Sequence, residues 1–161
     1  MKEYTPLTDL DSVISILSRI SFLGGVSDSQ RDEILKRFEL GSFKKGEYVS
    51  RKGDSPSHIY IIRKGKIHLM LTGEDGVESK KREFNVGECF GEAALLAMNN
   101  HTASWVAAED SQLIVLSRRA LNQVRIEDPS MFSILILNLA RELARKLQYT
   151  DEMMLRGEHL N

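Results

Sequence analysis

Hydrophobic residues recur at a helical period near the N-terminal end of the chain. Apolar positions every three or four residues between 9 and 22 predict an amphipathic helix, and the following Gly-Gly pair ends it. A second helix is expected to begin at Ser27 or Asp28, residue types that cap helices, and to run toward Gly41. The positions expected to be buried are Leu10, Val13, Ile14, Leu17, Ile20, Phe22, Ile34, Leu35 and Phe38.

The helical period returns in the last third of the chain. Ser117 is the predicted N-cap of a short helix that ends near Ile126. Asp128-Pro129-Ser130 then opens a long helix, because proline fits the first turn, where its missing N–H is not needed. The apolar positions of this helix include Phe132, Ile136, Leu139, Ala140, Leu143, Leu147 and Met154.

Between these helical segments the pattern changes to short β-type runs separated by glycine-bearing turns. The predicted strands are 48–49, 58–62, 66–72, 77–84, 105–107 and 113–116. Many short strands with turns about ten residues apart are typical of a sandwich or barrel. We therefore predict an α+β fold in one domain, 1–161, with N-terminal helices over 9–41, an antiparallel jelly-roll-like β-roll over 42–116 and C-terminal helices over 117–156.

Composition narrows the class of protein. The 161 residues contain 22 Lys plus Arg and 23 Asp plus Glu, a net charge of −1 that argues against a general polyanion binder. A single cysteine, Cys89, excludes an internal disulfide and a multi-cysteine metal site. No apolar run is long enough to span a bilayer, no signal peptide is visible, and no catalytic constellation stands out. The sequence predicts a cytoplasmic protein that is not an enzyme and needs no metal or cofactor.

One stretch, FGEAALL at residues 90–96, carries candidate chemistry. Gly91 follows a predicted strand and lets the backbone approach a ligand, and the next five residues form helix readily but make only a single turn. Free N–H groups at the start of such a turn favour an anion, whereas the Glu92 carboxylate suits a sugar hydroxyl. Together these features indicate a ribose phosphate. The alternative is an ordinary helix cap.

The same stretch resembles the phosphate-binding cassette of cyclic nucleotide-binding domains, written F-G-E-x-A-L-L…R-[TA]-A-[ST], over residues 90–104. Glycine-marked segments of the roll are also similar to that family, and residues 144–152 are similar to the helix that covers the nucleotide in its bacterial cyclic AMP receptors. The resemblance extends from about Phe22 to Met154. The roll segments are 43–47, 52–54, 59–66 and 86–88.

The resemblance implies a role for each matching cassette residue. Gly91 would let the sugar-phosphate lie against the backbone, and Glu92 would accept a hydrogen bond from the ribose 2′-hydroxyl. The N–H groups of Ala93 and Ala94 would hold the cyclic phosphate. The implied ligand is a cyclic nucleotide.

Further matching residues bear on the base. Thr102 and Ser104, on either side of Ala103 in the cassette, would offer hydroxyls to the phosphate or base. Leu147 and Thr150 match positions that cover and hydrogen-bond adenine. These two residues favour cyclic AMP, whereas Thr102 matches a position where a hydroxyl can favour guanine in kinase members of the family.

The sequence departs from the family at position 101, where His101 replaces the arginine that pairs with the phosphate. Arginine is permanently charged and forks toward a phosphate, whereas histidine offers one donor and is partly charged near neutrality. If His101 contacts the phosphate, affinity should rise as the pH falls through about 6.5. The alternative is that the pocket has lost its ligand and His101 is a loop residue.

Arg82 is a candidate for the missing charge. If Phe84 faces the core, the two-residue period of a strand places Arg82 on the same face, near the cassette. The alternative is that residues 80–82, KKR, form a solvated charge run.

The C-terminal helix has two expected roles. Ala140, Leu143, Leu147, Thr150 and Met154 recur at 3-4-3-4 spacing, the pattern of a short coiled-coil seam, and we expect a homodimer through this helix. The alternative is packing on the roll of the same chain.

The sequence supports two classes of function. The first is a stand-alone sensor that binds cyclic nucleotide, moves its last helix and meets an unidentified protein partner. The second is a nucleotide-free interaction module of the same fold. Only seven residues follow Met154, too few for a DNA-recognition helix, so direct DNA binding is not expected. Membrane association is not expected either, because no apolar run is long enough.

Overall fold

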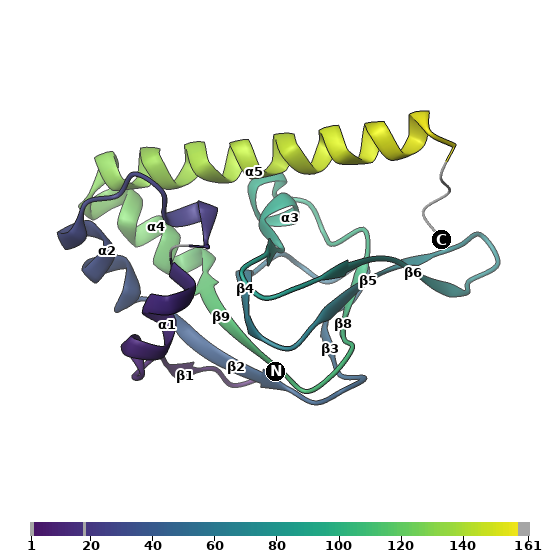
Figure 1. The fold of residues 1–161 in the computed structure, drawn as a ribbon, viewed down its shortest axis with the longest axis horizontal. Helices are drawn as coiled ribbons and strands as arrows, with labels where there is room; N and C mark the ends of the chain where they lie inside the picture. Colours follow the sequence, from purple (N-terminus) through teal and green to yellow (C-terminus); the bar gives the residue numbers. More distant parts are fainter. Residues whose placement is uncertain (1, 18, 158–161) are drawn as a thin grey trace.

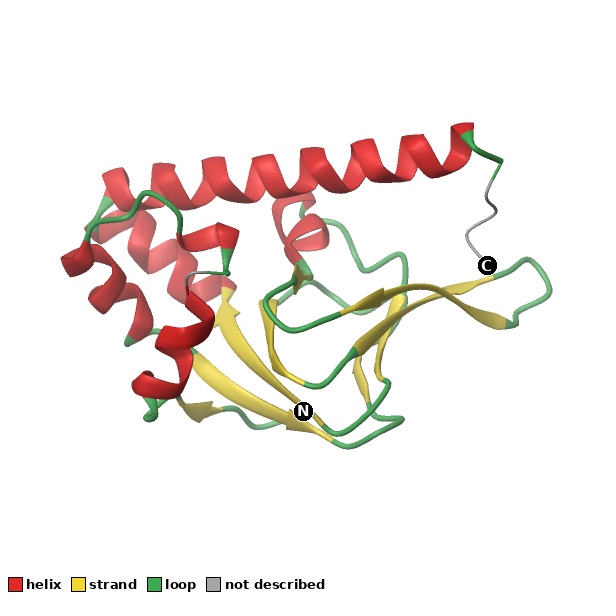
Figure 2. Ribbon diagram, viewed as in Figure 1, coloured by secondary structure: helices red, strands yellow, loops and turns green. Residues whose placement is uncertain are grey.

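The computed structural model describes residues 2–17 and 19–157. Two antiparallel sheets face each other, helices cover one end, and the long helix α5 (Pro129–Leu155) runs along the whole domain (Figures 1 and 2). The other helical elements are α1 (Leu10–Leu17), η1 (Ser21–Leu23), α2 (Asp28–Leu35), α3 (Glu92–Ala97) and α4 (Arg118–Glu127). The predicted α+β fold with a β-roll between helices is confirmed.

The sheets contain five and four strands. The first has the order β1-β2-β9-β4-β7, formed by β1 (Thr5–Pro6), β2 (Glu39–Phe43), β9 (Ser111–Ser117), β4 (His58–Lys64) and β7 (Cys89–Phe90). The second has the order β3-β8-β5-β6, formed by β3 (Tyr48–Ser50), β8 (Ser104–Ala107), β5 (Ile67–Thr72) and β6 (Glu78–Phe84). Neighbouring strands are antiparallel throughout the described pairs.

The five-stranded sheet separates two hydrophobic cores. On β4, Ile59 and Ile61 pack with the helices, whereas Tyr60 and Ile62 pack between the sheets. Strand β9 divides its residues in the same way. Alternate side chains of a strand point to opposite faces, so a sheet buried on both faces needs a continuous apolar run. This requirement explains why 113–116 is LIVL.

The predicted helix starts are confirmed. Ser27 caps α2 in a capping box with Gln30, and Ser117 caps α4 by accepting the Ala120 N–H. Asp128 caps α5 through Met131, with Pro129 in the first turn. Within residues 2–17 and 19–157, no helix is both long and apolar enough to cross a bilayer.

The N-terminal segment differs from the prediction. The second helix ends at Leu35, and Glu39–Phe43 forms a strand, β2, that the sequence did not indicate. Leu10 and Ile14 are exposed, whereas Val13, Ile20 and Phe22 are buried as expected. Ser18 and the Leu17 side chain lie outside the described residues.

Two further strands, β1 and β7, were also missed. Each has only two residues, so neither shows a period that a sequence pattern could register.

The first half of α5 is fixed to the N-terminal helices. The buried Asn138 side chain donates to the backbone carbonyls of Phe22 and Gly24, at 2.9 and 2.7 Å. Ser21 also donates to Glu142 at 3.0 Å. Beyond Glu142 the helix leaves the N-terminal helices and passes over the open end of the roll (Figure 1).

Candidate functional site

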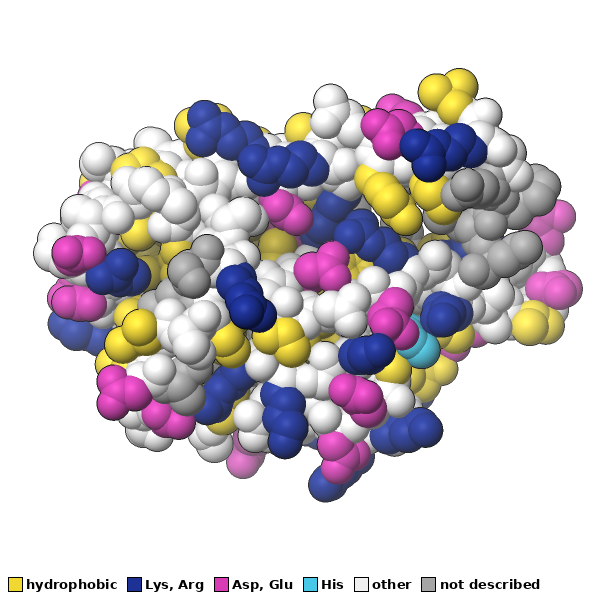
Figure 3. Space-filling model, in the orientation of Figure 1, with side chains coloured by type: hydrophobic (Ala, Val, Ile, Leu, Met, Phe, Trp, Pro, Cys, Tyr) yellow, Lys and Arg dark blue, Asp and Glu magenta, His cyan; other side chains and the backbone are white. Residues whose placement is uncertain are grey.

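A cavity of about 510 Å³ lies beneath the second half of α5. Its walls come from the four-stranded sheet, the segment from Gly91 to Ala103, and α5. In the space-filling view, a hollow below α5 has basic side chains within its rim (Figure 3). This volume lies in the range of small-molecule sites.

The cavity brings together ten of the eleven residues that were predicted to bind the ligand. They are Arg82, Gly91, Glu92, Ala93, Ala94, His101, Thr102, Ala103, Leu147 and Thr150. Ser104 is the exception. It is buried in β8, and its hydroxyl accepts the Lys52 N–H at 3.1 Å and also bonds to Glu78. The Ser104 hydroxyl is therefore used inside the fold.

Gly91 determines how α3 begins. It has a φ of 86°, in the left-handed region that favours glycine, and it lies directly before α3. A Cβ at this position would lie 2.8 Å from the His58 carbonyl oxygen. The fold itself thus requires glycine here, independently of any ligand, and it directs the first turn of α3 into the cavity.

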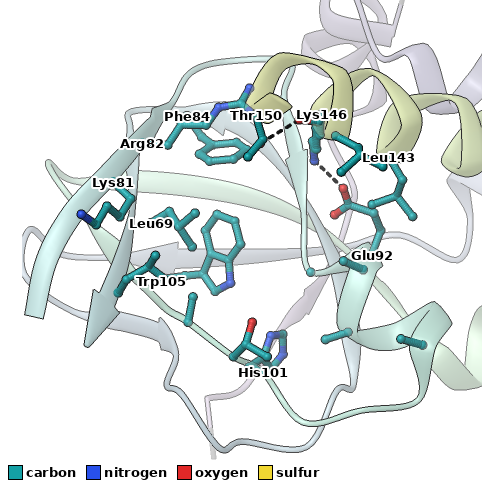
Figure 4. A pocket seen from close by; sticks show the side chains of 18 of the residues that line it. Leu69, Lys81, Arg82, Phe84, Glu92, His101, Trp105, Leu143, Lys146 and Thr150 are labelled. Carbon is teal, nitrogen blue, oxygen red and sulfur yellow. Dashed lines mark hydrogen bonds and ion pairs between the residues drawn. The ribbon is translucent and has the colours of Figure 1, made fainter. Parts of the chain in front are cut away.

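Glu92 is buried, and its carboxylate forms an ion pair with Lys146 of α5 (Figure 4). The Glu92 side chain is 2% exposed and that of Lys146 is 18% exposed. The same Lys146 ammonium donates to the Cys89 carbonyl oxygen at 2.7 Å. A carboxylate removed from water needs such a partner. Lys146 therefore ties α5 to both β7 and α3.

His101 lies across the cavity from Lys146 (Figure 4). Its backbone is fixed by two hydrogen bonds to the loop before β4, one from its N–H to the Asp54 carbonyl at 2.9 Å and one from the Gly53 N–H at 2.8 Å. The side chain is buried, and desolvation lowers its pKa, although the Asp54 charge acts in the opposite direction. Burial of the ring therefore favours the neutral imidazole.

Arg82 shares a face of β6 with Phe84, as the strand period predicted. Its guanidinium lies 4.3 Å from the Phe84 ring centroid and forms an ion pair with Glu88 at 2.9 Å. Lys81 also lines the cavity and Lys80 is exposed, so residues 80–82 are not simply a solvated run. Arg82 supplies a charge to the cavity, but Glu88 already balances it.

Three aromatic residues, Phe84, Trp105 and Tyr149, line the cavity. Trp105 stacks on Phe90 with ring centroids 4.4 Å apart and meets Phe84 edge to face at 5.0 Å. The guanidinium carbon of Arg82 lies 5.3 Å from the ring centroid of Tyr149 on α5. These rings present flat, apolar faces of the kind against which a planar base stacks.

The second half of α5 presents one face to the cavity and another to solvent. Leu143 and Thr150 are half-buried over the cavity, and the Thr150 hydroxyl donates to the Lys146 carbonyl at 3.0 Å. Leu147 lines the cavity edge but is 62% exposed. The residues of the predicted coiled-coil seam therefore do not share one environment. Leu143 and Thr150 face the cavity, whereas Ala140, Leu147 and Met154 are exposed.

Sequence reasoning missed Lys146, Tyr149 and Trp105 as cavity residues. A signal for Lys146 was present, because positions 143, 146, 147 and 150 share one helix face and two of them had been assigned to the ligand. Trp105 begins the predicted strand 105–107, for which the sequence indicated no ligand contact. Among the described residues, no group of His, Cys, Asp and Glu side chains could hold a metal ion.

Comparison with known proteins gives a consistent result. The family model for the cyclic nucleotide-binding domain matches residues 40–128, more than half of the chain. The chain is 31% identical to the cyclic AMP receptor protein of Thermus thermophilus and 30% identical to the cyclic nucleotide-gated channel subunit beta-1 of Bos taurus. A crystal structure of a cyclic nucleotide-binding domain from Methylobacillus flagellatus superposes with a TM-score of 0.84 at 17% identity, over 96% of this chain and 88% of that one.

The curated relatives are longer than this chain. The matches include 79% of this chain but 57% of the receptor protein, and 86% of this chain but 10% of the channel subunit. The similarity therefore concerns one domain of each relative.

The buried His101 predicts a dependence of stability on pH. Its pKa is lower in the folded chain than the value of about 6.5 in the unfolded chain, so below pH 6.5 the unfolded state binds more protons. The free energy of unfolding should fall as the pH falls from 7.5 to 5. His101→Gln should reduce this slope in urea titrations at several pH values. His58, whose pKa desolvation also lowers, should keep part of the slope in both proteins, and equal slopes would contradict the prediction.

The Lys146–Glu92 pair predicts an energetic coupling. Lys146→Met leaves a buried carboxylate unpaired and should cost roughly 3 kcal/mol of stability, the lower end of the range for breaking a buried pair. Adding Glu92→Gln to that variant should recover at least half of the loss in urea unfolding. Arg145→Met, on the exposed side of α5, is the control and should cost less than about 0.5 kcal/mol. Additive effects of the two substitutions would exclude the coupling.

Proposed function

The chain belongs to the cyclic nucleotide-binding domain family, and on that premise we propose that it is a regulatory domain that binds cyclic AMP in the cavity beneath α5. The observation that carries this proposal is the position of Glu92. Its buried carboxylate lies at the start of α3 and faces the cavity, with one oxygen on Lys146. The second oxygen has the chemistry to accept a ribose 2′-hydroxyl.

The rest of the cavity supports a nucleotide in this orientation. With the ribose on Glu92, the phosphate lies near the N–H groups of Ala93 and Ala94, and the base extends toward Trp105 and α5. The Thr150 oxygen retains lone pairs, so it can accept a hydrogen bond from an exocyclic amino group. Adenine and guanine both carry such a group, so we infer adenine from the similarity to a protein named cyclic AMP receptor protein.

We propose that signalling uses α5. Asn138 fixes the first half of the helix, whereas the second half is held through Lys146 at the cavity itself. A ligand that donates a hydrogen bond to Glu92 and fills the space below the helix changes how firmly this half is held. Ala140, Leu147 and Met154 are exposed on α5 and offer an apolar surface to a protein partner or to a second copy in a homodimer. The proposed setting is the cytoplasm.

The specific observation that favours the alternative, a nucleotide-free interaction module, is the neutral, buried His101. Without a charged partner at that position, a cyclic phosphate loses a charge-assisted hydrogen bond of about 1.5–3 kcal/mol, or roughly 10- to 150-fold in affinity.

Calorimetric titration with cyclic AMP at pH 7.5 tests the proposal. We expect saturable binding, and Glu92→Gln should weaken it at least about tenfold, because a hydrogen bond to a charged group is lost. Glu152→Gln, on the exposed face of α5, is the matched control and should leave the affinity unchanged.

The ribose contact has its own control. 2′-Deoxy cyclic AMP should bind the wild type more weakly than cyclic AMP. The difference should be smaller for Glu92→Gln, whose amide oxygen is an uncharged and weaker acceptor. Absence of heat at millimolar cyclic AMP would overturn the proposal and favour the interaction module.

A further inference from the structure

We propose that this pocket recognises mainly the ribose and base of its ligand, and that it takes an uncharged purine ribonucleoside such as adenosine at least as tightly as the cyclic nucleotide. The inference rests on the proposed function because it concerns the same cavity. The inference goes beyond the proposed function because it names a second ligand class. It is drawn from the charges that line the cavity.

Two of the cations that line the cavity, Lys146 and Arg82, are already balanced. The Lys146 ammonium is held by the Glu92 carboxylate and by the Cys89 carbonyl oxygen. The Arg82 guanidinium pairs with Glu88 at 2.9 Å and lies over the Phe84 ring. A phosphate that drew either cation to itself would leave a partly or fully buried carboxylate without its partner, which is costly.

The remaining basic groups do not supply a charge to the centre. Lys81 has its own partner within the chain, and its ammonium points away from the middle of the cavity (Figure 4). His101 is 6% exposed, and the desolvation that lowers its pKa keeps the imidazole neutral at pH 7.5. His101 therefore offers an incoming phosphate one hydrogen-bond donor, and its burial disfavours the charged imidazolium form.

The groups that would meet the uncharged parts of a ligand are well placed. Glu92 faces the cavity as an acceptor for a ribose hydroxyl, and Trp105, Leu69 and Leu143 form apolar walls. Because Lys146 and Glu92 neutralise each other, this ion pair offers a bound anion no net attraction. Desolvating a phosphate without a charged partner therefore offsets the few hydrogen bonds that the phosphate gains.

The test is calorimetric titration of the wild-type chain at pH 7.5 with adenosine, cyclic AMP and 2′-deoxyadenosine. We expect the Kd of adenosine to be no more than about threefold higher than the Kd of cyclic AMP. 2′-Deoxyadenosine should bind more weakly than adenosine, because it lacks the hydroxyl for Glu92. Cyclic AMP binding more than threefold tighter than adenosine would overturn the inference.

The outcomes separate this inference from the proposed function. If cyclic AMP binds more than threefold tighter than adenosine, only the inference fails. If adenosine binds and cyclic AMP does not, the inference stands and the cyclic nucleotide proposal fails. If neither ligand binds, both fail.

His101→Arg tests the charge argument directly. A permanent cation at this position should tighten cyclic AMP binding about tenfold or more and change adenosine binding less than threefold. Gln148→Arg adds the same charge on the exposed side of α5 and serves as the control, for which neither affinity should change. Equal effects of His101→Arg on the two ligands, or no effect on either, would contradict the explanation.

Discussion

The ion pair between Lys146 and Glu92 is the contact on which the organisation of the site depends. A carboxylate that is 2% exposed has to be compensated from within the protein, and the compensating group comes from α5 rather than from the roll. Because Lys146 also holds the Cys89 carbonyl oxygen, one ammonium group joins the helix to the strand and to the short helix that form the cassette. Glu92, which we propose binds the ribose, therefore also holds α5, the helix that we propose transmits the signal.

Two fixed structures make this contact possible. The five-stranded sheet is buried on both faces, so β4 and β9 hold β7 and the start of α3 in place. Asn138 holds the first half of α5 against the N-terminal helices. Between these rigid parts, the second half of α5 rests over a cavity and not over a packed core. A long helix fixed at one end and supported by a few polar contacts at the other is suited to a ligand-dependent change in position.

Local signals in the sequence predicted most of the fold, and contacts between distant segments were the main omissions. The helix starts at Ser27, Ser117 and Asp128 could be predicted because capping is a local interaction. Strand β2, which contains Gly41, lacked a strand pattern and is held by its pairing with β9. Ten of the eleven proposed site residues line one cavity. The resemblance of the cassette and the last helix to the family implied nine of them, and the strand period suggested Arg82. The pairing of Lys146 with Glu92, 54 residues apart, and the burial of His101 depend on tertiary packing.

Hydrogen exchange across α5, with and without saturating cyclic AMP, tests the central claim most directly. The account predicts that the ligand changes the exchange rates of amides from Leu143 to Leu155, because this half of the helix is held at the cavity. Amides around Asn138 should exchange at the same rate in both states, since the contacts of that residue with Phe22 and Gly24 lie outside the cavity. Saturable binding with unchanged exchange throughout the second half of α5 would contradict the claim.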